Sequence, residues 1–264
     1  MEENNIQNTQ DQEIQFNPDT RLWESKYWLP SVTCDAVVFG YDEDEDEGKG
    51  KLKILLIKRG RDPYKGFWAL PGGFMQQKDE NLKACVRREL NEETNVELSR
   101  LEFFGEYSDK GRDKRGQVIS IAFLALVRQG DLHPLGGDDA ADAQWFSIDD
   151  LHKLKLAFDH EKIIEDAKEE LKLRIRNEPI GFDLLNKEFT MPQLQRIYIA
   201  IFNPPESDTT IRDRRNFPKK MFKLGYIKDT GKKMTGNPHR SPKLYTFDEE
   251  AYNIAKKKGI MLQF

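Results

Sequence analysis

A short stretch that joins paired glycines to a glutamate-rich helix most narrowly restricts what this chain can fold into. Residues 72–96 read GGFMQQKDENLKACVRRELNEETNV, and the pattern predicts a helix from about residue 80 to residue 94. At about 100° per residue, three glutamates share one face of that helix and continue a stripe that is apolar one turn earlier. The glutamates are Glu89, Glu92 and Glu93, and the apolar residues are Leu82, Cys85 and Val86. We therefore expect the three carboxylates to point toward the body of the protein.

Inward-facing carboxylates favour a metal ion, because they repel one another unless a cation lies among them. Ligands that are all hard oxygen atoms, with no nitrogen or sulfur partner, point to Mg²⁺ or Mn²⁺. Arg88 lies four residues before Glu92 and can hold a carboxylate in position. The helix therefore predicts a magnesium or manganese site.

The same stretch resembles the Nudix box, the loop-helix-loop signature of Nudix hydrolases, through Gly73, Glu80 and the run RELNEETNV at residues 88–96. Two features differ from that signature. The loop between Gly73 and Glu80 carries one extra residue, and Asn95 replaces the closing glycine. The second change is mild because asparagine tolerates a left-handed backbone.

The resemblance implies a role for each residue that matches the signature. The implied catalytic residues are Glu92, Glu93 and Arg88. The implied metal ligands are Gly73, Glu80, Glu89, Glu92 and Glu93, with Arg88 orienting the acids and Glu80 supporting the cluster. In Nudix enzymes the substrate is a nucleoside diphosphate linked to another group, X. A divalent ion held by carboxylates suits that chemistry, because it neutralises phosphate charge and acidifies a water molecule.

Three further segments resemble the branch of the family that handles ADP-ribose: LLIKRGRDPYKGFWALPGGF, GRDKRGQVISIAFLAL and LAFDHEKIIEDA. This resemblance implies contacts to a diphosphate from Arg61, Arg112 and Arg115. It also implies stacking of Trp68 or Phe158 on a base or ribose. A structural alternative stays open for each residue, namely a solvated arginine or an aromatic ring in the core.

Two other positions are candidates for the same site. Asp138 and Asp139 lie in the loop GGDDAADA, where one of them, Asp139 in our prediction, would contact the ligand or act as an extra metal ligand or base. His160 follows Asp159 at a predicted helix start, and it either acts in the site or belongs to the helix cap.

Five apolar runs predict strands at residues 31–39, 53–57, 102–107, 118–127 and 143–146. The acidic run YDEDEDEGKGK between the first two predicts a solvated hairpin loop in preference to a metal site. An amphipathic helix is expected at residues 159–176, with Asp159 as its N-cap. The first 25 residues are polar without periodicity and predict a disordered tail.

The charge of the chain is divided unevenly along its length. The formal net charge is −4, yet residues 209–245 hold eleven Lys and Arg against two Asp, so that this segment carries +9 and the remainder −13. Such a division indicates a module that faces nucleic acid, joined to an acidic domain.

The basic segment has the order of elements of a winged helix. A helix at residues 190–202 with Thr190 as N-cap, a basic helix at residues 210–224 and a hairpin returning at residues 243–247 are expected. Inward packing is predicted for Ile211, Phe217, Met221, Phe222 and Leu224. The predicted DNA contacts are Arg212, Arg214, Arg215, Asn216, Lys219, Lys220, Lys223, Lys232, Lys233 and Arg240. The alternative is an inert cationic surface.

The segments GFDLLNKEFTMPQLQRIYIAIF, RDRRNFPKKMFKLGYI and HRSPKLYTF resemble the C-terminal DNA-binding domain of Nudix-related transcriptional regulators, the NrtR-like group. This resemblance implies an α+β protein, with a Nudix α/β/α sandwich around a mixed sheet followed by a small winged helix-turn-helix domain. The expected divisions are a tail at residues 1–25, a Nudix domain at residues 26–178 and a winged-helix domain at residues 179–264. Such regulators bind palindromic double-stranded DNA as homodimers, and their Nudix domain often senses ADP-ribose or a sugar-derived ligand.

Composition argues against other classes. No apolar run is long enough to cross a membrane, no signal peptide is present, and two cysteines without a CxxC motif support neither a disulfide framework nor a zinc site, so a cytoplasmic protein is expected. The preferred interpretation is a DNA-binding regulator that senses ADP-ribose, with magnesium-dependent cleavage to AMP and ribose 5-phosphate. The alternatives are a purely enzymatic ADP-ribose pyrophosphatase and a catalytically silent repressor of NAD or sugar metabolism genes.

Overall fold

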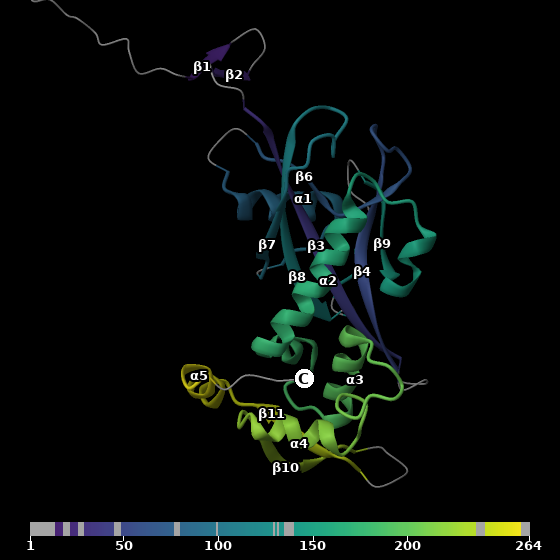
Figure 1. Cartoon of the computed structure of the whole chain (residues 1–264), viewed down its shortest axis with the longest axis vertical. Helices are drawn as coiled ribbons and strands as arrows, with labels where there is room; N and C mark the ends of the chain where they lie inside the picture. Colours follow the sequence, from purple (N-terminus) through teal and green to yellow (C-terminus); the bar gives the residue numbers. More distant parts are fainter. Residues whose placement is uncertain are drawn as a thin grey trace, which may run out of the picture.

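The computed structural model describes residues 14–17, 22–25, 29–44, 49–76, 80–98, 100–128, 130, 132–134, 140–235 and 241–259. A mixed sheet flanked by helices forms one end of the elongated molecule and a winged helix the other (Figure 1). Within the described residues, no helix is long and apolar enough to cross a membrane. Inside the predicted tail, β1 (Ile14–Asn17) pairs with β2 (Leu22–Ser25) in a short hairpin, and the rest of the predicted tail lies outside the described residues.

The sheet is mixed, as expected. Its main strands are β3 (Ser31–Asp44), β4 (Lys49–Arg59), β5 (Trp68–Ala69), β7 (Glu102–Tyr107) and β8 (Val118–Arg128). They follow the order β5-β4-β3-β8-β7, with β6 (Gly72–Phe74) on β3 and β9 (Ala140–Ser147) on β4. Only the pairing of β3 with β8 is parallel among these described strands. The predicted hairpin between the first two long strands is confirmed by the pairing of Asp44 with Lys49, but its predicted loop is too long, because residues 41–44 belong to β3 and residues 49–51 to β4.

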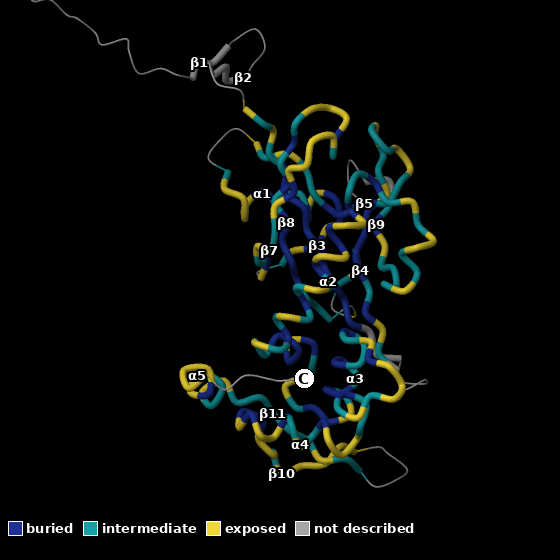
Figure 2. Tube along the Cα trace, viewed as in Figure 1, coloured by how far each residue is buried: buried dark blue, intermediate teal, exposed yellow. Residues whose placement is uncertain are grey.

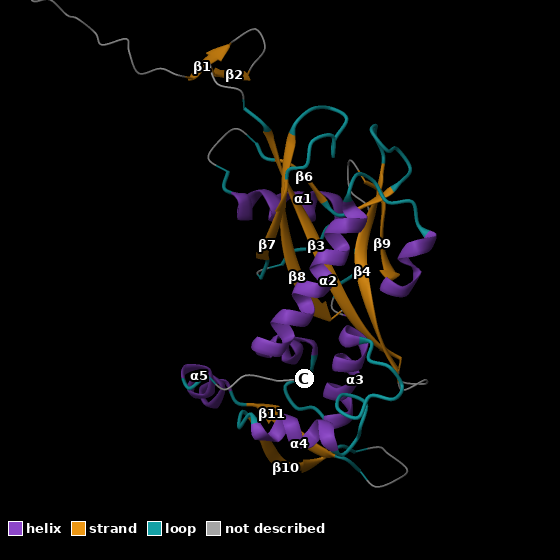
Figure 3. Cartoon of the chain, in the orientation of Figure 1, coloured by secondary structure: helices purple, strands orange, loops and turns teal. Residues whose placement is uncertain are grey.

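Alternation along β3 builds two cores, because successive side chains of a strand point to opposite faces. Cys34, Ala36 and Val38 face α1 (Leu82–Thr94), where they pack on Cys85, Val86 and Leu90. Val37 and Phe39 face the other side, toward α2 (His160–Asn177). The sheet therefore lies between two helical layers, as in the predicted sandwich (Figure 3).

The winged helix contains α3 (Met191–Phe202), α4 (Asn216–Lys223), β10 (Ile227–Lys233) and β11 (Lys243–Phe247). Thr190 caps α3 as predicted, in a reciprocal capping box with Gln193. The predicted start of the second helix at residue 210 is wrong. Asp208 and Asp213 accept hydrogen bonds from the backbone at residues 210–216 and hold that segment in turns, so α4 begins at Asn216.

One further helix, α5 (Glu249–Lys257), was not predicted, although Asp248 caps it and two glutamates open it. Two short 3₁₀ helices, η2 (Ile148–Lys153) and η3 (Pro179–Leu184), flank α2 in the sequence.

The apolar core on the α2 side of the sheet continues without a break into the winged helix. It runs from Phe39 and Ile54 through Leu171 and Ile175 to Tyr198 and Phe217. Buried residues therefore line β3, β4 and β8 and reappear across the joint between the domains (Figure 2). At that joint the Tyr198 hydroxyl donates to the Ile175 carbonyl at 3.4 Å.

Candidate functional site

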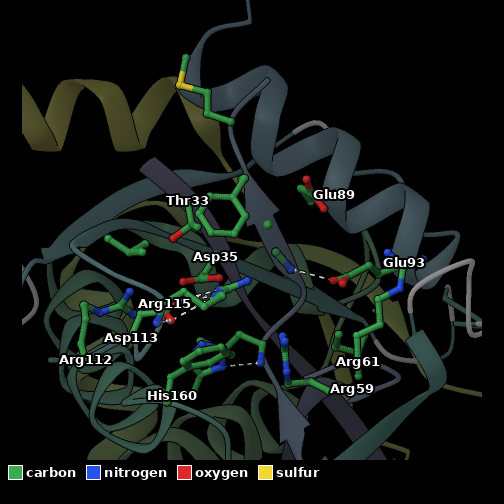
Figure 4. A pocket seen from close by; sticks show the side chains of 18 of the residues that line it. Thr33, Asp35, Arg59, Arg61, Glu89, Glu93, Arg112, Asp113, Arg115 and His160 are labelled. Carbon is green, nitrogen blue, oxygen red and sulfur yellow. Dashed lines mark hydrogen bonds and ion pairs between the residues drawn. The ribbon is translucent and has the colours of Figure 1, made fainter. Parts of the chain in front are cut away.

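A cavity of about 460 Å³ opens beside the sheet at the N-terminal end of α2. Its floor is the start of β3 together with β6, and α1 contributes acids from one side. The turn after β4, the loop at residues 108–117 and the first residues of α2 complete the walls (Figure 4). Segments that are far apart in the sequence thus meet in one space.

Arg88 joins three glutamates at the edge of this cavity. Its Nε donates to Glu80 at 2.8 Å, and its Nη1 donates to Glu89 at 2.7 Å and to Glu92 at 3.0 Å. Its Nη2 also donates to the Phe74 carbonyl at 3.1 Å. The residues expected to form a cluster around Arg88 are therefore together, and Arg88 restrains their orientation.

The three carboxylates of α1 do not all point inward, so that expectation is wrong for Glu92. Glu89 and Glu93 line the cavity, whereas the Glu92 side chain is 53% exposed. Glu92 lies at the edge of the stripe, where Arg88, four residues earlier, holds it at the surface. Leu82 is also exposed, because it lies in the first turn of the helix beyond the sheet.

The two inward acids occupy an unfavourable electrostatic environment in the absence of a cation. Burial raises the pKa of Glu93 to about 8, and the negative charges of Glu89 and Asp35 act in the same direction. The Gly72 amide donates to Glu93 at 2.8 Å and partly opposes that increase. Burial also raises the pKa of Glu89. Burial therefore disfavours the charged form of both carboxylates, and Arg88 offsets this only in part at Glu89.

The donor set here fits a hard divalent cation. Glu89 lies directly against Gly73, since a Cβ at Gly73 would be 2.5 Å from the Glu89 carboxyl carbon. Two carboxylates and a nearby backbone carbonyl are oxygen ligands of the kind that Mg²⁺ takes. In the described part of the chain, however, no three His, Cys, Asp or Glu side chains are grouped closely enough to hold a metal ion as they stand.

Glu80 does not line the cavity. It accepts hydrogen bonds from Arg88 and from the Gln76 amide, the latter at 2.8 Å. The residues between them, 77–79, lie outside the described residues, as do Asp138 and Asp139.

A basic wall faces these acids. Arg112 donates to both carboxylate oxygens of Asp159, at 2.9 and 2.7 Å, and its side chain is only 5% exposed. Arg115 forms a similar pair with the buried Asp113 at 2.6 Å. Arg61 also lines the cavity. All three arginines predicted to contact a diphosphate are thus brought to one space.

The aromatic predictions separate into two cases. Phe158 lines the cavity, with the guanidinium groups of Arg59 and Arg115 at 4.9 and 5.6 Å from its ring centroid. Trp68 is not among the residues that line the cavity, because its ring packs edge-on against Phe146 at 4.5 Å. The structural alternative for Trp68 is therefore the one that the structure supports.

Asp159 does not take its expected role as a side-chain cap, and His160 lies in the site rather than in the helix cap. The Asp159 side chain makes no capping hydrogen bond, because Arg112 occupies its carboxylate. His160 is buried at the cavity, and its Nδ1 accepts from the Leu70 amide at 2.9 Å. Burial lowers the pKa of His160, so the ring is neutral and its other nitrogen carries the proton.

Sequence reasoning missed Asp35, Arg59 and Asp113. Asp35 is buried at the cavity floor, where the Ser120 hydroxyl donates to it. Arg59 donates to the Pro63 carbonyl at 2.8 Å, and burial lowers its pKa. The available signal for Asp35 was a lone acid within the apolar run SVTCDAVVF.

Gly72 and Gly73 lead to a paired prediction. A Cβ at Gly72 would overlap the Cys34 carbonyl and lie 2.5 Å from an Asp35 oxygen, whereas the three atoms nearest to a Cβ at Gly73 all belong to the flexible Glu89 side chain. Gly72→Ala is expected to lower the free energy of unfolding by about 1–3 kcal/mol, and Gly73→Ala by less. Urea-induced unfolding measures both variants. Equal losses of stability would contradict this assignment of the contacts.

The basic residues of the winged helix lie mostly at its surface. Arg214, Arg215, Asn216, Lys219, Lys223, Lys232 and Lys233 are exposed, and Lys220 is half-buried. Arg212 is different, because it donates to the Pro204 carbonyl at 2.7 Å and pairs with Glu206 at 3.3 Å. Arg240 lies outside the described residues. Phe222 was expected to pack inward but is 42% exposed, and it contacts only the ring of Tyr245 among described aromatic rings.

Comparison with known proteins identifies both halves of the chain. Residues 35–167 match the NUDIX domain family, and residues 181–247 match the NrtR DNA-binding winged helix domain. The ADPR responsive transcriptional repressor NtrR of Acinetobacter baylyi is 30% identical over 233 residues, covering 88% of this chain and 87% of that protein.

Two other proteins are similar to parts or most of the chain. The ADP-ribose pyrophosphatase of Methanocaldococcus jannaschii is 44% identical over 140 residues, which cover 53% of this chain and 74% of that protein. The crystal structure of Shewanella oneidensis NrtR complexed with a 27mer DNA has a TM-score of 0.64 at 28% identity, covering 84% of this chain and 95% of that chain.

Proposed function

We propose, because the chain belongs to the NrtR-like family of Nudix-related transcriptional regulators, that it binds DNA through its winged helix and ADP-ribose through its Nudix cavity. In this proposal the ligand changes the affinity for DNA. The observation that carries it is a charged cavity that shares one apolar core with a winged helix whose exposed surface is basic.

The cavity suits a molecule with a diphosphate in its middle. Arg59, Arg112 and Arg115 supply positive charge on one wall, and guanidinium groups recognise phosphate oxygens in a bidentate manner. Phe158 and Phe74 offer aromatic surface for a base or a ribose. The relative from Acinetobacter baylyi, which responds to ADPR, supports ADP-ribose as the ligand.

Cleavage of ADP-ribose to AMP and ribose 5-phosphate is a second candidate function. The arrangement of Glu80, Glu89 and Glu92 around Arg88, with Glu93 at the cavity, favours it. A bound Mg²⁺ or Mn²⁺ would supply phosphate neutralisation and a more acidic water. Glu89 and Glu93 would hold the ion, the arginines would bind the diphosphate, and Glu93 would accept a proton. The pyrophosphatase of Methanocaldococcus jannaschii supports this candidate.

The two candidates are tested with the full-length protein. DNA is selected from a random duplex pool, and the affinity for the selected DNA is measured with and without ADP-ribose in EDTA. We expect a palindromic site bound by a homodimer, because the winged helix of each copy reads one half-site. No change in affinity with saturating ADP-ribose would reject the sensor. AMP release from ADP-ribose with Mg²⁺, measured separately, tests whether the protein is a hydrolase, and no release would reject that candidate.

The basic surface predicts a specific salt dependence. Lys219→Gln on α4 is expected to weaken binding to all DNA sequences alike. It should reduce the magnitude of the slope of log K against log salt by about two, one for each copy in the homodimer. Lys83→Gln, an exposed lysine on α1, is the matched control and should leave the slope unchanged. Fluorescence anisotropy at several salt concentrations measures both. An unchanged slope for Lys219→Gln would remove α4 from the DNA interface.

A further inference from the structure

Arg112 connects the cavity to α2. It lines the cavity, yet its Nε and Nη2 both donate to Asp159, the residue immediately before the helix. The Arg112 side chain is 5% exposed and the Asp159 side chain 21%, so this pair is largely removed from water. A buried guanidinium needs an anion, and a phosphate group offers the same two-oxygen geometry as a carboxylate. An anionic ligand and Asp159 therefore compete for one arginine.

Asp159 has a second arrangement available once Arg112 turns to a ligand. It occupies the N-cap position of α2, but its side chain makes no capping bond there. Aspartate at this position ordinarily accepts from the amides of the first helical turn. If Arg112 is released, the Asp159 carboxylate can instead accept from the amides of the first turn of α2. The start of α2 then has two states, one with Asp159 paired to Arg112 and one with Asp159 as a cap.

The loop that carries Arg112 is attached to α2 at two more points. The Tyr107 hydroxyl, at the end of β7, donates to Asp166 at 3.0 Å, and Lys162 pairs with Asp109 at 3.5 Å. A displacement of Arg112 therefore moves a cavity wall that contacts the first two turns of α2.

At its other end α2 packs directly on the winged helix. Ile175 is fully buried, and its carbonyl accepts from Tyr198 of α3. A Cβ at Gly181 would lie 3.0 Å from Ile175 Cδ1, so η3 passes close against this residue. Helix α2 thus has its first residue at the cavity and its last turns against the DNA-binding domain, with one apolar face buried along its length (Figure 1).

We propose that the Arg112–Asp159 ion pair is a ligand-sensitive latch, which holds α2 in its DNA-competent position until a diphosphate in the cavity draws Arg112 away. The inference rests on the proposed function, in which ADP-ribose occupies the cavity and alters DNA binding. Asp159 is a positioning residue in this scheme, since it acts on the ligand and on DNA through Arg112 and α2.

Asp159→Asn tests the latch in the full-length protein. In the wild type, ADP-ribose in EDTA is expected to change DNA affinity by roughly 5- to 150-fold. The ligand-free Asp159→Asn protein should already have the DNA affinity of the ligand-bound wild type. It should also bind ADP-ribose more tightly by calorimetry, because the competing carboxylate is gone. Lys153→Gln, which breaks the exposed Lys153–Asp150 pair, is the control and should behave as the wild type.

The outcomes separate the two hypotheses. A wild type whose DNA affinity ignores ADP-ribose rejects the proposed function. A responsive wild type together with an Asp159→Asn protein of unchanged DNA and ligand affinities overturns the latch alone. Hydrogen exchange on the wild type decides the matter if the variant does not fold. ADP-ribose should then change the exchange of amides at residues 171–184, and no change there overturns the proposal.

Discussion

Glu93→Gln is expected to abolish most of the magnesium-dependent cleavage proposed above as the second candidate function, while making the metal-free protein more stable in mild alkali. Glutamine keeps an oxygen that accepts from the Gly72 amide but removes the charge that would hold a cation and accept a proton. We expect the rate of AMP release to fall by a factor on the order of 100 or more. The measurement is AMP release from ADP-ribose under saturating Mg²⁺.

The stability effect follows from the direction of the pKa shift. The pKa of Glu93 is raised from 4.5 to about 8, so its folded-state advantage is complete below pH 4.5 and is lost as the pH rises through about 8. Glutamine does not ionise and has no such loss. At pH 8–9 without metal, Glu93→Gln should therefore exceed the wild type by roughly 3–5 kcal/mol at most.

Mg²⁺ provides the control for this prediction. The ion should raise the melting temperature of the wild type at pH 8, because it would add positive charge beside the buried carboxylates of Glu89 and Glu93. It should have much less effect on Glu93→Gln. If the wild type and Glu93→Gln lose stability equally between pH 5 and pH 8, the raised pKa of Glu93 is not the cause of the loss.

Tyr198→Ala is expected to produce the largest loss of stability among core substitutions. The side chain is fully buried, and its ring lies 5.3 Å from that of Phe217 and 6.1 Å from that of Phe202. Removing a buried aromatic ring costs about 3–5 kcal/mol of unfolding free energy through lost burial and the cavity that remains. DNA binding should fall as well, because Tyr198 joins α3 both to α4 and to the end of α2.

Tyr198→Phe is the matched control for the ring itself. It removes only the hydroxyl that donates to the Ile175 carbonyl at 3.4 Å, so we expect a loss of about 1 kcal/mol. Urea-induced unfolding followed by tryptophan fluorescence measures both variants. A similar loss for the two would show that the hydrogen bond, and not the ring, holds the joint.

Helical periodicity predicted the angular positions of the acidic residues around α1, but it did not predict the direction of every side chain. Glu89 and Glu93 face the cavity as the pattern predicted, since the sheet buries that side of the helix. Glu92 lies at the margin of the same stripe, and its direction depends on a hydrogen bond to Arg88. Periodicity fixes the angle of a residue about the helix axis, whereas a long side chain at the margin follows its partner.

The residues of the opposite cavity wall could not be predicted from local sequence patterns, because the topology of the fold brings them together. Asp35 reaches the floor because β3 pairs with both β6 and β8, which sets it beside Gly72 and Ala122. Arg112 meets Asp159 across 47 positions of sequence. Strand order and register bring these residues together, and a single sequence carries no direct signal for either. The turn before α4 is different, because the aspartates at 208 and 213 gave a usable local signal.

The unbroken apolar core between the sheet and the winged helix means that neither domain can be removed without exposing apolar surface on the other. A chain cut after Asn177 would expose the faces of α2 and α3 that now meet, including Ile175 and Tyr198. Each fragment would then carry an exposed apolar surface where the other domain now packs. For the same reason, evolution could replace this winged helix with another only by reshaping the matching end of α2 at the same time.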